Sequence, residues 1–292
     1  MAIDKLREKI RKTKNPLLLD LCVCSNWIPE DLLSQEGSVL RGYYRMCMEL
    51  MEALRGSIPA VRFHFGQLAA LGTDGLTLLA SLTDRAKTLG YYVVMDIPQG
   101  LSRMDGEFYA QQFFARECPW YFDGLITGAY IGSDGITPYL PYLKELGKDL
   151  FVVLRTANKT ASEVQDLLTG GRLVHTAVAD LVSRHGQKLL EKSGYSQLGG
   201  VAGASSAGSL GNLRSKYKQM FLILDGADYP NASASACSGG FDRLGNGAIA
   251  SVGKYVLAAW EDSMNVDDTW LDCAVNAVQR MKKNLTRYIT VL

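Results

Sequence analysis

The chain has 292 residues, of which 47% are hydrophobic, and it carries 31 basic against 30 acidic side chains. This composition is that of a globular protein with a sizeable core, and the balanced charge gives no general attraction for a nucleic-acid polymer or an acidic membrane surface. Residues 1–15 alternate charged and apolar side chains, unlike a signal peptide, and no apolar run approaches the roughly 20 residues that span a bilayer. We therefore expect neither nucleic acid nor membrane as a partner.

The cysteines are scattered through apolar segments, without the spacing of a disulfide framework or a zinc site. They are Cys22, Cys24, Cys47, Cys118, Cys237 and Cys273. This pattern predicts thiols of a reducing cytoplasm. Cys22 and Cys24 would share one face of a strand, but no second pair of ligands accompanies them, so we predict no metal and no cofactor.

Apolar runs of strand length recur along the whole chain, each followed by a stretch with helical periodicity. The runs occupy residues 16–24, 59–65, 91–97, 122–130, 149–156, 198–204, 219–227 and 247–253. Helices are expected between and after them, at residues 30–54, 73–90, 160–186, 254–260 and 276–285. This alternation is typical of parallel βα units.

Eight strands with intervening helices match the size and strand count of a closed (β/α)₈ TIM barrel. The alternative is an open, doubly wound α/β sheet, which usually has fewer strands and a glycine-rich first turn. The first turn here, residues 23–30, contains no glycine. We predict a single barrel domain that covers residues 1–292.

In such a barrel the functional residues lie at the carboxyl ends of the strands. Polar residues at these predicted ends are Asn26, Arg62, His64, Asp96, Tyr130, Arg155, Asn158, Ser205, Ser206, Asp225, Asp228, Ser251 and Lys254. Each also has a structural interpretation. A lone histidine such as His64 is more often a hydrogen-bonded core residue, and Arg155 can simply hold the loop after its strand.

Several segments follow one another in a familiar order. They are residues 3–10 with the strand that follows, 70–76, 96–110, 151–167, 199–205 and 247–249. Together these segments, which extend over nearly the whole chain, resemble the longer bacterial orotidine 5'-phosphate decarboxylases. The resemblance implies a (β/α)₈ barrel, a homodimer and a UMP-forming lyase of pyrimidine biosynthesis.

The residues that the resemblance marks as catalytic are mostly replaced. Asn26 stands where the family has an aspartate that contacts ribose, and Arg62 where it has a lysine. Of the family signature Asp-x-Lys-x-x-Asp, only the first member remains, as Asp96. Pro98 and Leu101 take the places of the lysine and the second aspartate.

The positions that the family uses for phosphate and for the partner subunit also differ. The family's glycine-rich phosphate loop corresponds to residues 224–235, which here contain Asp225 and Asp228. Lys254 matches the phosphate-binding arginine. Asp105 falls near a threonine that reaches toward the partner's active site. Acidic residues at a phosphate loop would repel the dianion unless they turn away.

The substitution of the lysine bears directly on the chemistry. In the family, a lysine ammonium held between aspartates stabilises the carbanion and supplies the proton. Pro98 has no ionisable group, and a guanidinium such as that of Arg62 is a poor proton donor at neutral pH. We expect Asp96 to pair with Arg62 instead.

Three hypotheses follow. In the first, a repurposed barrel binds a small polar or phosphorylated ligand at Asn26, Arg62, His64, Asp96, Asp105, Arg155, Ser205 and Lys254, with Arg62 and Asp96 at the reaction centre. In the second, the chain is an active orotidine 5'-phosphate decarboxylase. In the third, it is a non-enzymatic scaffold whose mouth is closed by Trp27, Tyr130 and Tyr229. A magnesium site shared by Asp96 and Asp225 is disfavoured, because their strands lie on opposite sides of the barrel.

Overall fold

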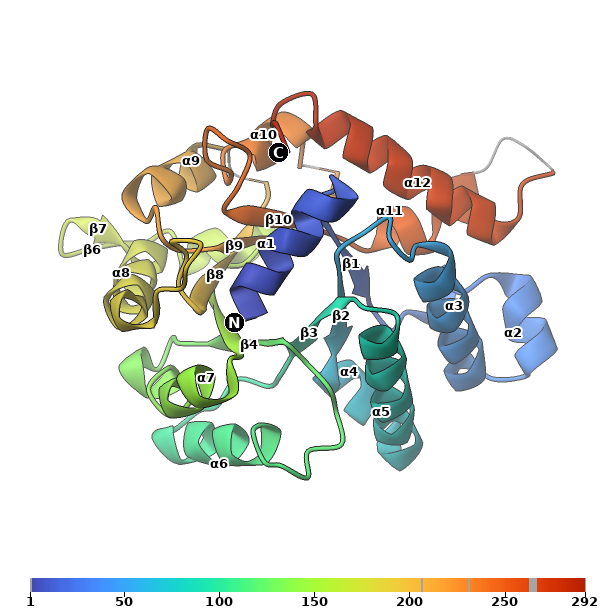
Figure 1. Ribbon diagram of the computed structural model, residues 1–292, viewed down its shortest axis with the longest axis horizontal. Coiled ribbons are helices and arrows are strands. Elements are labelled where there is room, and N and C mark those ends of the chain that lie inside the picture. The colour runs from blue at the N-terminus through green and yellow to red at the C-terminus, as the bar shows by residue number, and fades with distance from the viewer. Residues whose placement is uncertain (1, 206, 231, 263–266, 292) are drawn as a thin grey trace.

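Eight parallel strands close into a barrel in the computed structural model, which describes residues 2–205, 207–230, 232–262 and 267–291 (Figure 1). The strands are β1 Leu17–Leu21, β2 Ala60–His64, β3 Tyr92–Asp96, β4 Gly124–Gly128, β5 Asp149–Arg155, β8 Leu198–Gly203, β9 Leu222–Asp225 and β10 Ala248–Val252. Each lies within one of the predicted apolar runs. The (β/α)₈ fold is therefore confirmed.

Helices surround the barrel (Figure 1). They are α1 Ala2–Thr13, α2 Glu30–Glu36, α3 Val39–Ala53, α4 Phe65–Ala69, α5 Gly72–Thr88, α6 Arg103–Phe113, α7 Leu140–Leu146, α8 Val174–Gly186, α9 Ala207–Lys216, α10 Ala234–Ser238, α11 Lys254–Leu257 and α12 Trp270–Leu285. In the described part of the chain, none combines the length and apolar character that crossing a bilayer requires.

Alternation along each strand produces two separate cores. In β1, Leu17, Leu19 and Leu21 point outward and join the core between strands and helices. Leu18 belongs to the inner core, which fills the barrel with side chains such as Tyr92, Phe151 and Phe221. By the same period of two, Asp20 follows Leu18 on the inward face.

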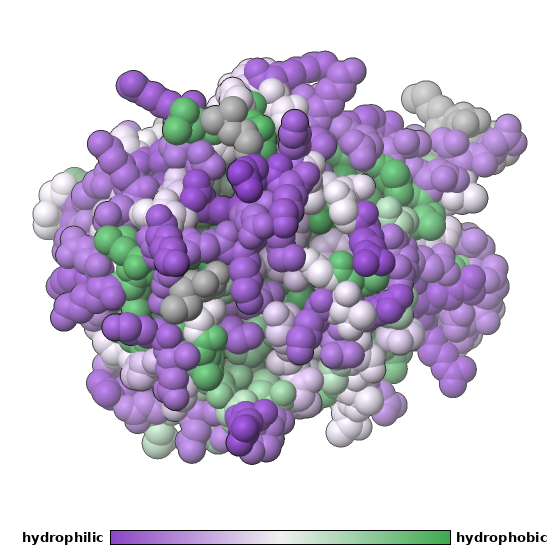
Figure 2. Space-filling view, in the orientation of Figure 1, coloured by the Kyte–Doolittle hydropathy of each residue, from purple (hydrophilic) through white to green (hydrophobic). Residues whose placement is uncertain are grey.

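Helix α1 closes the amino-terminal end of the barrel. Its apolar side chains Ile3, Leu6 and Ile10 are buried in the inner core. The surface around it is mainly hydrophilic (Figure 2). This helix therefore covers the end of the barrel opposite the carboxyl ends of the strands.

Two predicted helices are interrupted. The segment 30–54 is divided by Gly37, whose φ of 68° ends α2, and by Ser38, whose hydroxyl accepts the Arg41 amide as N-cap of α3. The segment 160–186 is helical only in its second part, α8. Before α8 lie the 3₁₀ turn Lys159–Glu163 and a hairpin of β6 Leu168–Thr169 and β7 Arg172–Leu173. The adjacent glycines 170 and 171, both at positive φ, favour the hairpin turn over a helix.

An acidic side chain is buried near the amino-terminal end of the barrel. Asp149, the first residue of β5, is fully buried, and its Oδ2 accepts a 2.5 Å hydrogen bond from the Tyr92 hydroxyl. Burial raises the pKa of this carboxyl well above its ordinary value, despite the opposing effect of the Tyr92 hydrogen bond. Folding therefore favours the protonated form of Asp149.

We predict that Asp149→Asn reduces the loss of stability that the protein suffers as pH rises. A carboxyl with a raised folded-state pKa gives its full stability below the unfolded value of about 4, and this is lost as pH rises toward the folded pKa. Between those values the wild type should lose up to about 1.4 kcal/mol per pH unit relative to the variant. Urea denaturation of both proteins from pH 5 to pH 8 measures the two slopes. Parallel slopes would show that Asp149 is ionised in the folded protein.

Candidate functional site

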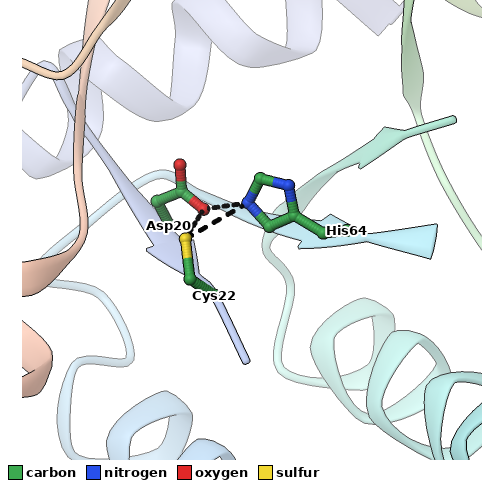
Figure 3. A group of neighbouring side chains, drawn as sticks. All are labelled: Asp20, Cys22 and His64. Carbon is green, nitrogen blue, oxygen red and sulfur yellow. Dashed lines mark hydrogen bonds and ion pairs between the residues drawn. The ribbon is translucent and has the colours of Figure 1, made fainter. Parts of the chain in front are cut away.

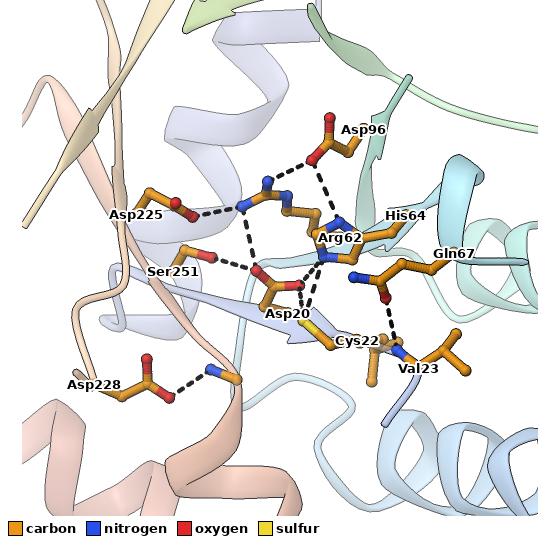
Figure 4. A network of polar contacts seen from close by, with 12 residues as sticks. Asp20, Cys22, Val23, Arg62, His64, Gln67, Asp96, Asp225, Asp228 and Ser251 are labelled. Carbon is orange, nitrogen blue, oxygen red and sulfur yellow. Dashed lines mark hydrogen bonds and ion pairs between the residues drawn. The ribbon is translucent and has the colours of Figure 1, made fainter. Parts of the chain in front are cut away.

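A single guanidinium occupies the open end of the barrel and contacts carboxylates from three strands (Figure 4). Arg62 Nη1 lies 3.2 Å from Asp20 Oδ2 and 2.6 Å from Asp225 Oδ1, while Nη2 lies 2.6 Å from Asp96 Oδ2. The Ser251 hydroxyl donates to the same Asp20 oxygen at 3.2 Å. We call Asp20, Cys22, Arg62, His64, Asp96, Asp225 and Ser251 the mouth network.

Strand register explains this convergence. Asp20 is paired with Arg62 across β1 and β2, and His64 with Asp96 across β2 and β3. Inward-facing residues at the same level of adjacent parallel strands necessarily lie close together. Asp225 ends β9, on the far side of the barrel, and the length of the arginine side chain bridges the gap. The sequence correctly placed Asp96 and Asp225 on opposite strands, and the structure shows that both reach Arg62.

The ion pairs shift the pKa values of both partners. Burial would lower the pKa of Arg62, but Asp20, Asp225 and Asp96 together raise it well above its ordinary value. Burial would raise the pKa of Asp20, but Arg62 and His64 hold it well below its usual range. Arg62 is therefore a permanent cation in this site and cannot act as its acid.

His64 extends the network toward the end of β1 (Figure 3). Its Nε2 lies 2.5 Å from Asp20 Oδ1 and 3.4 Å from Cys22 Sγ, and its Nδ1 lies 3.3 Å from Asp96 Oδ2. The Cys22 thiol in turn donates to Asp20 Oδ1 at 3.2 Å. His64 is thus not the lone core histidine that its sequence neighbours suggested, because two carboxylates from adjacent strands flank it.

The backbone amides at the start of α11 are occupied by an internal carboxylate. Asp228 Oδ2 accepts the amide hydrogens of Gly253 at 2.8 Å and of Tyr255 at 3.0 Å. Asp228 thus turns away from Arg62. It fills a position at which an exposed pair of amides would otherwise attract an anion. Lys254, between these two residues, is exposed.

Of the eight predicted site residues, the structure brings together Arg62, His64 and Asp96, and the predicted pair of Arg62 and Asp96 is present. The other five, Asn26, Asp105, Arg155, Ser205 and Lys254, make no hydrogen bond or ion pair with these three among the described residues, and the predicted Ser206 lies outside them. Asn26 is exposed in the 3₁₀ turn Ser25–Trp27, and Ser205 lies in the turn after β8.

Arg155 and Asp105 have local structural partners. Arg155 makes a bidentate pair with Asp166, through Nε at 2.9 Å and Nη2 at 2.8 Å. Asp105 forms a capping box with Ser102 at the start of α6. The structural interpretation of Arg155, as the residue that holds the loop after its strand, is therefore the one that its contacts support.

Asp20 and Cys22 were not predicted, because the apolar run 16–24 suggested a strand that extends to residue 24. The strand ends at Leu21, so both residues lie at the barrel mouth. The alternation of inward and outward side chains along the strand could have identified both residues. Counting in steps of two from the inward Leu18 leads to Asp20 and then to Cys22.

The aromatic residues expected in a closed mouth do not seal this one. The side chains of Asp96 and Asp225 remain 30% and 27% exposed. Trp27 packs against the outer core, and the Tyr130 hydroxyl donates to the Leu154 carbonyl at 2.7 Å. Tyr229 is itself 47% exposed. Solvent therefore reaches the carboxylates beside Arg62, which weighs against a plugged scaffold.

We predict that Arg62→Met strongly destabilises the protein, because it leaves three neighbouring carboxylates without their shared cation. Breaking a buried ion pair on one side lowers the free energy of unfolding by on the order of 3 kcal/mol. Arg62→Lys keeps the charge but loses the two-pronged guanidinium. Its free energy of unfolding should lie between those of Arg62→Met and the wild type. Arg172→Met, on the exposed β6–β7 hairpin, is the control and should leave the urea midpoint nearly unchanged. Equal midpoints for Arg62→Met and Arg172→Met would contradict the prediction.

The known proteins that are similar in sequence to this chain share one name. No model of a known protein family matches the sequence. The protein named orotidine 5'-phosphate decarboxylase in Clostridium acetobutylicum is 27% identical over 288 residues, which are 98% of this chain and 99% of that protein. The protein of the same name in Rhodopirellula baltica is 26% identical over 259 residues, 86% of each chain.

Solved structures agree on the fold. The orotidine 5'-monophosphate decarboxylase of Plasmodium berghei superposes with a TM-score of 0.77 at 13% identity, and the OMP decarboxylase of Leishmania donovani with 0.74 at 18% identity. In each case 98% of both chains is covered. Such low identities establish the shared barrel alone. Together with the sequence similarity over nearly the full length, they support membership of this chain in the orotidine 5'-phosphate decarboxylase family.

Proposed function

We propose that this protein is a divergent member of its family that binds a small polar ligand at the barrel mouth and does not decarboxylate orotidylate by the lysine and aspartate mechanism. The observation that carries the proposal is the mouth network itself. Arg62, the cation nearest to Asp96, is held by three carboxylates, and Pro98 stands where the mechanism needs an ammonium group.

The geometry does not support another lysine as the missing proton donor. Lys254 is the lysine that follows a strand end, and its exposed side chain makes no hydrogen bond or ion pair with the mouth network among the described residues. Asp96 keeps its place at the end of β3, but its partner is a guanidinium that cannot release a proton at neutral pH. The site thus keeps a positive charge beside Asp96, but the group that carries this charge cannot supply the proton.

Recognition of a phosphate group is also disfavoured. The amides of Gly253 and Tyr255 already bind the Asp228 carboxylate, so a phosphate would have to displace it and meet its charge. Burial raises the pKa of Asp228, while these amide hydrogen bonds oppose the rise. A ligand without a phosphate fits the mouth better than a nucleotide.

The accessible chemistry of the mouth defines the ligand class. Asp96 and Asp225 present partly exposed carboxylate oxygens above the buried Arg62. Carboxylates accept hydrogen bonds and attract cations. We therefore expect a small ligand rich in N–H or O–H donors, which would contact these two residues.

The alternative function is an active orotidine 5'-phosphate decarboxylase, a lyase of pyrimidine biosynthesis. The observation that favours it is the similarity to proteins of that name over nearly the whole chain, including the retained Asp96. In that case the proton would have to come from a group other than residue 98.

The two functions differ in one measurement. We predict that purified protein leaves the absorbance of orotidine 5'-monophosphate unchanged, and that Asp96→Asn behaves like the wild type. Turnover by the wild type that is lost in Asp96→Asn would overturn the proposal and establish the decarboxylase. Small polar compounds rich in hydrogen-bond donors should raise the melting temperature of the wild type and not that of Asp225→Asn, which tests the binding itself.

We further infer a homodimer, as the family resemblance implies, with α6 at its interface. Leu101, just before this helix, and Met104 and Phe108 within it are each more than half exposed. An exposed apolar group of this kind is typical of a surface that binds another protein. Asp105 lies between these residues in the sequence. The proposed location is the cytoplasm, where the six free thiols would stay reduced.

We predict that Met104→Glu combined with Phe108→Glu converts the dimer into monomers, because two buried carboxylates would face each other across the interface. Light scattering after size-exclusion chromatography measures the mass directly. The control is Leu168→Glu, an equally exposed apolar position on the β6–β7 hairpin, which should stay dimeric. A monomeric wild type, or a double variant that remains dimeric, would refute this interface.

A further inference from the structure

Three different metal-ligand types meet at the edge of the mouth network (Figure 3). Asp20 Oδ1, Cys22 Sγ and His64 Nε2 all lie within 4.8 Å of one another. The individual separations are 3.2 Å from sulfur to oxygen, 3.4 Å from sulfur to nitrogen and 2.5 Å from nitrogen to oxygen. A carboxylate, a thiol and an imidazole therefore crowd around one point.

We propose that Asp20, Cys22 and His64 form a binding site for a zinc-class divalent transition-metal ion. Bond lengths of about 2.0 to 2.3 Å around a tetrahedral ion place its ligand atoms roughly 3.3 to 3.6 Å apart. Both distances from sulfur are already close to this range. Only the oxygen and nitrogen atoms have to separate, by somewhat less than about 1 Å, which a small rotation of the His64 ring provides.

The second atom of each polar ligand is held by another residue (Figure 4). Asp20 Oδ2 accepts from Arg62 Nη1 and from the Ser251 hydroxyl, each at 3.2 Å, so Oδ1 is the oxygen directed at Cys22 and His64. The Nδ1 of His64 faces Asp96 at 3.3 Å, which leaves Nε2 for the ion. A histidine oriented by a carboxylate through its other nitrogen is the usual arrangement at metal centres.

A thiol nucleophile activated by His64 is a poorer explanation of the same cluster. Asp20 Oδ1 lies closer to Nε2 than Cys22 does, and it also accepts the thiol hydrogen. A carboxylate in this position opposes formation of a free thiolate but serves naturally as a third ligand.

The ligand set selects the class of ion. Thiolate and imidazole ligands suit Zn²⁺ and Co²⁺, whereas Mg²⁺ and Ca²⁺ prefer oxygen ligands alone. The charges of one thiolate and one carboxylate balance a divalent cation. Three protein ligands leave one position for water or for a polar group of a ligand, as in catalytic zinc sites. The inference goes beyond the proposed function and does not depend on it.

Cobalt is the probe for this site, because a thiolate bound to Co²⁺ gives a charge-transfer band in the near ultraviolet. The full-length protein is treated with a chelator and titrated with Co²⁺ and then with Zn²⁺. We expect one equivalent of Co²⁺ to bind, the band to appear, and Zn²⁺ to abolish it. Ser251→Ala, which removes one partner of Asp20, should weaken zinc binding about 10-fold.

Matched variants identify the ligands. Cys22→Ser should lose the charge-transfer band and bind zinc at least about 100-fold more weakly, whereas Cys24→Ser, two residues further on, should behave like the wild type. His64→Gln provides a second ligand variant, and melting curves without metal confirm that each protein is folded. A band that survives in Cys22→Ser, or one that is lost equally in Cys24→Ser, would overturn the proposal. So would the absence of stoichiometric binding by the wild type.

Discussion

The structure of the barrel mouth depends on the burial of one guanidinium among three carboxylates. Arg62 is only 7% exposed, and its partners come from β1, β3 and β9, so its position is fixed from both sides of the barrel. A charge in such surroundings is tolerated only when it is fully paired. Asp20 therefore has to point inward, and that orientation in turn brings His64 and Cys22 into contact with it. The candidate site is thus a consequence of neutralising Arg62.

The fold was largely accessible from the sequence, because a parallel strand buried on both faces leaves an unmistakable apolar run. All eight strands lie where such runs occur. What periodicity does not reveal is where a strand stops. The run through residue 24 concealed that β1 ends at Leu21, and this hid Asp20 and Cys22 from the site prediction. The hairpin before α8 was not predicted. The helical periodicity of residues 174–186 suggested one helix that began before the turn at residues 170 and 171.

Only part of the site could be predicted from the sequence, because some of its residues lie far apart along the chain. The pair of Arg62 and Asp96 joins neighbouring strands, and a family pattern pointed to both positions. Asp225 reaches Arg62 from 163 residues away, through the length of a side chain whose direction no local pattern encodes. Arg155 and Lys254 were expected at the mouth by their places after strands. At such positions, side-chain partners such as Asp166 determine the direction of the side chain.

The closure of the amino-terminal end by α1 has a consequence for how the chain reaches its native state. This helix precedes every barrel strand along the chain, yet the inner core that receives it includes Phe221, Ile223 and Ile249, which lie at the last two strands, β9 and β10. Contacts between such distant parts of a chain form late and slowly, because the loop entropy has to be overcome before they are gained. On the ribosome, Ile3, Leu6 and Ile10 remain without their final partners until most of the barrel has emerged. Full docking of this amphipathic helix therefore requires strands from both the early and the late parts of the chain.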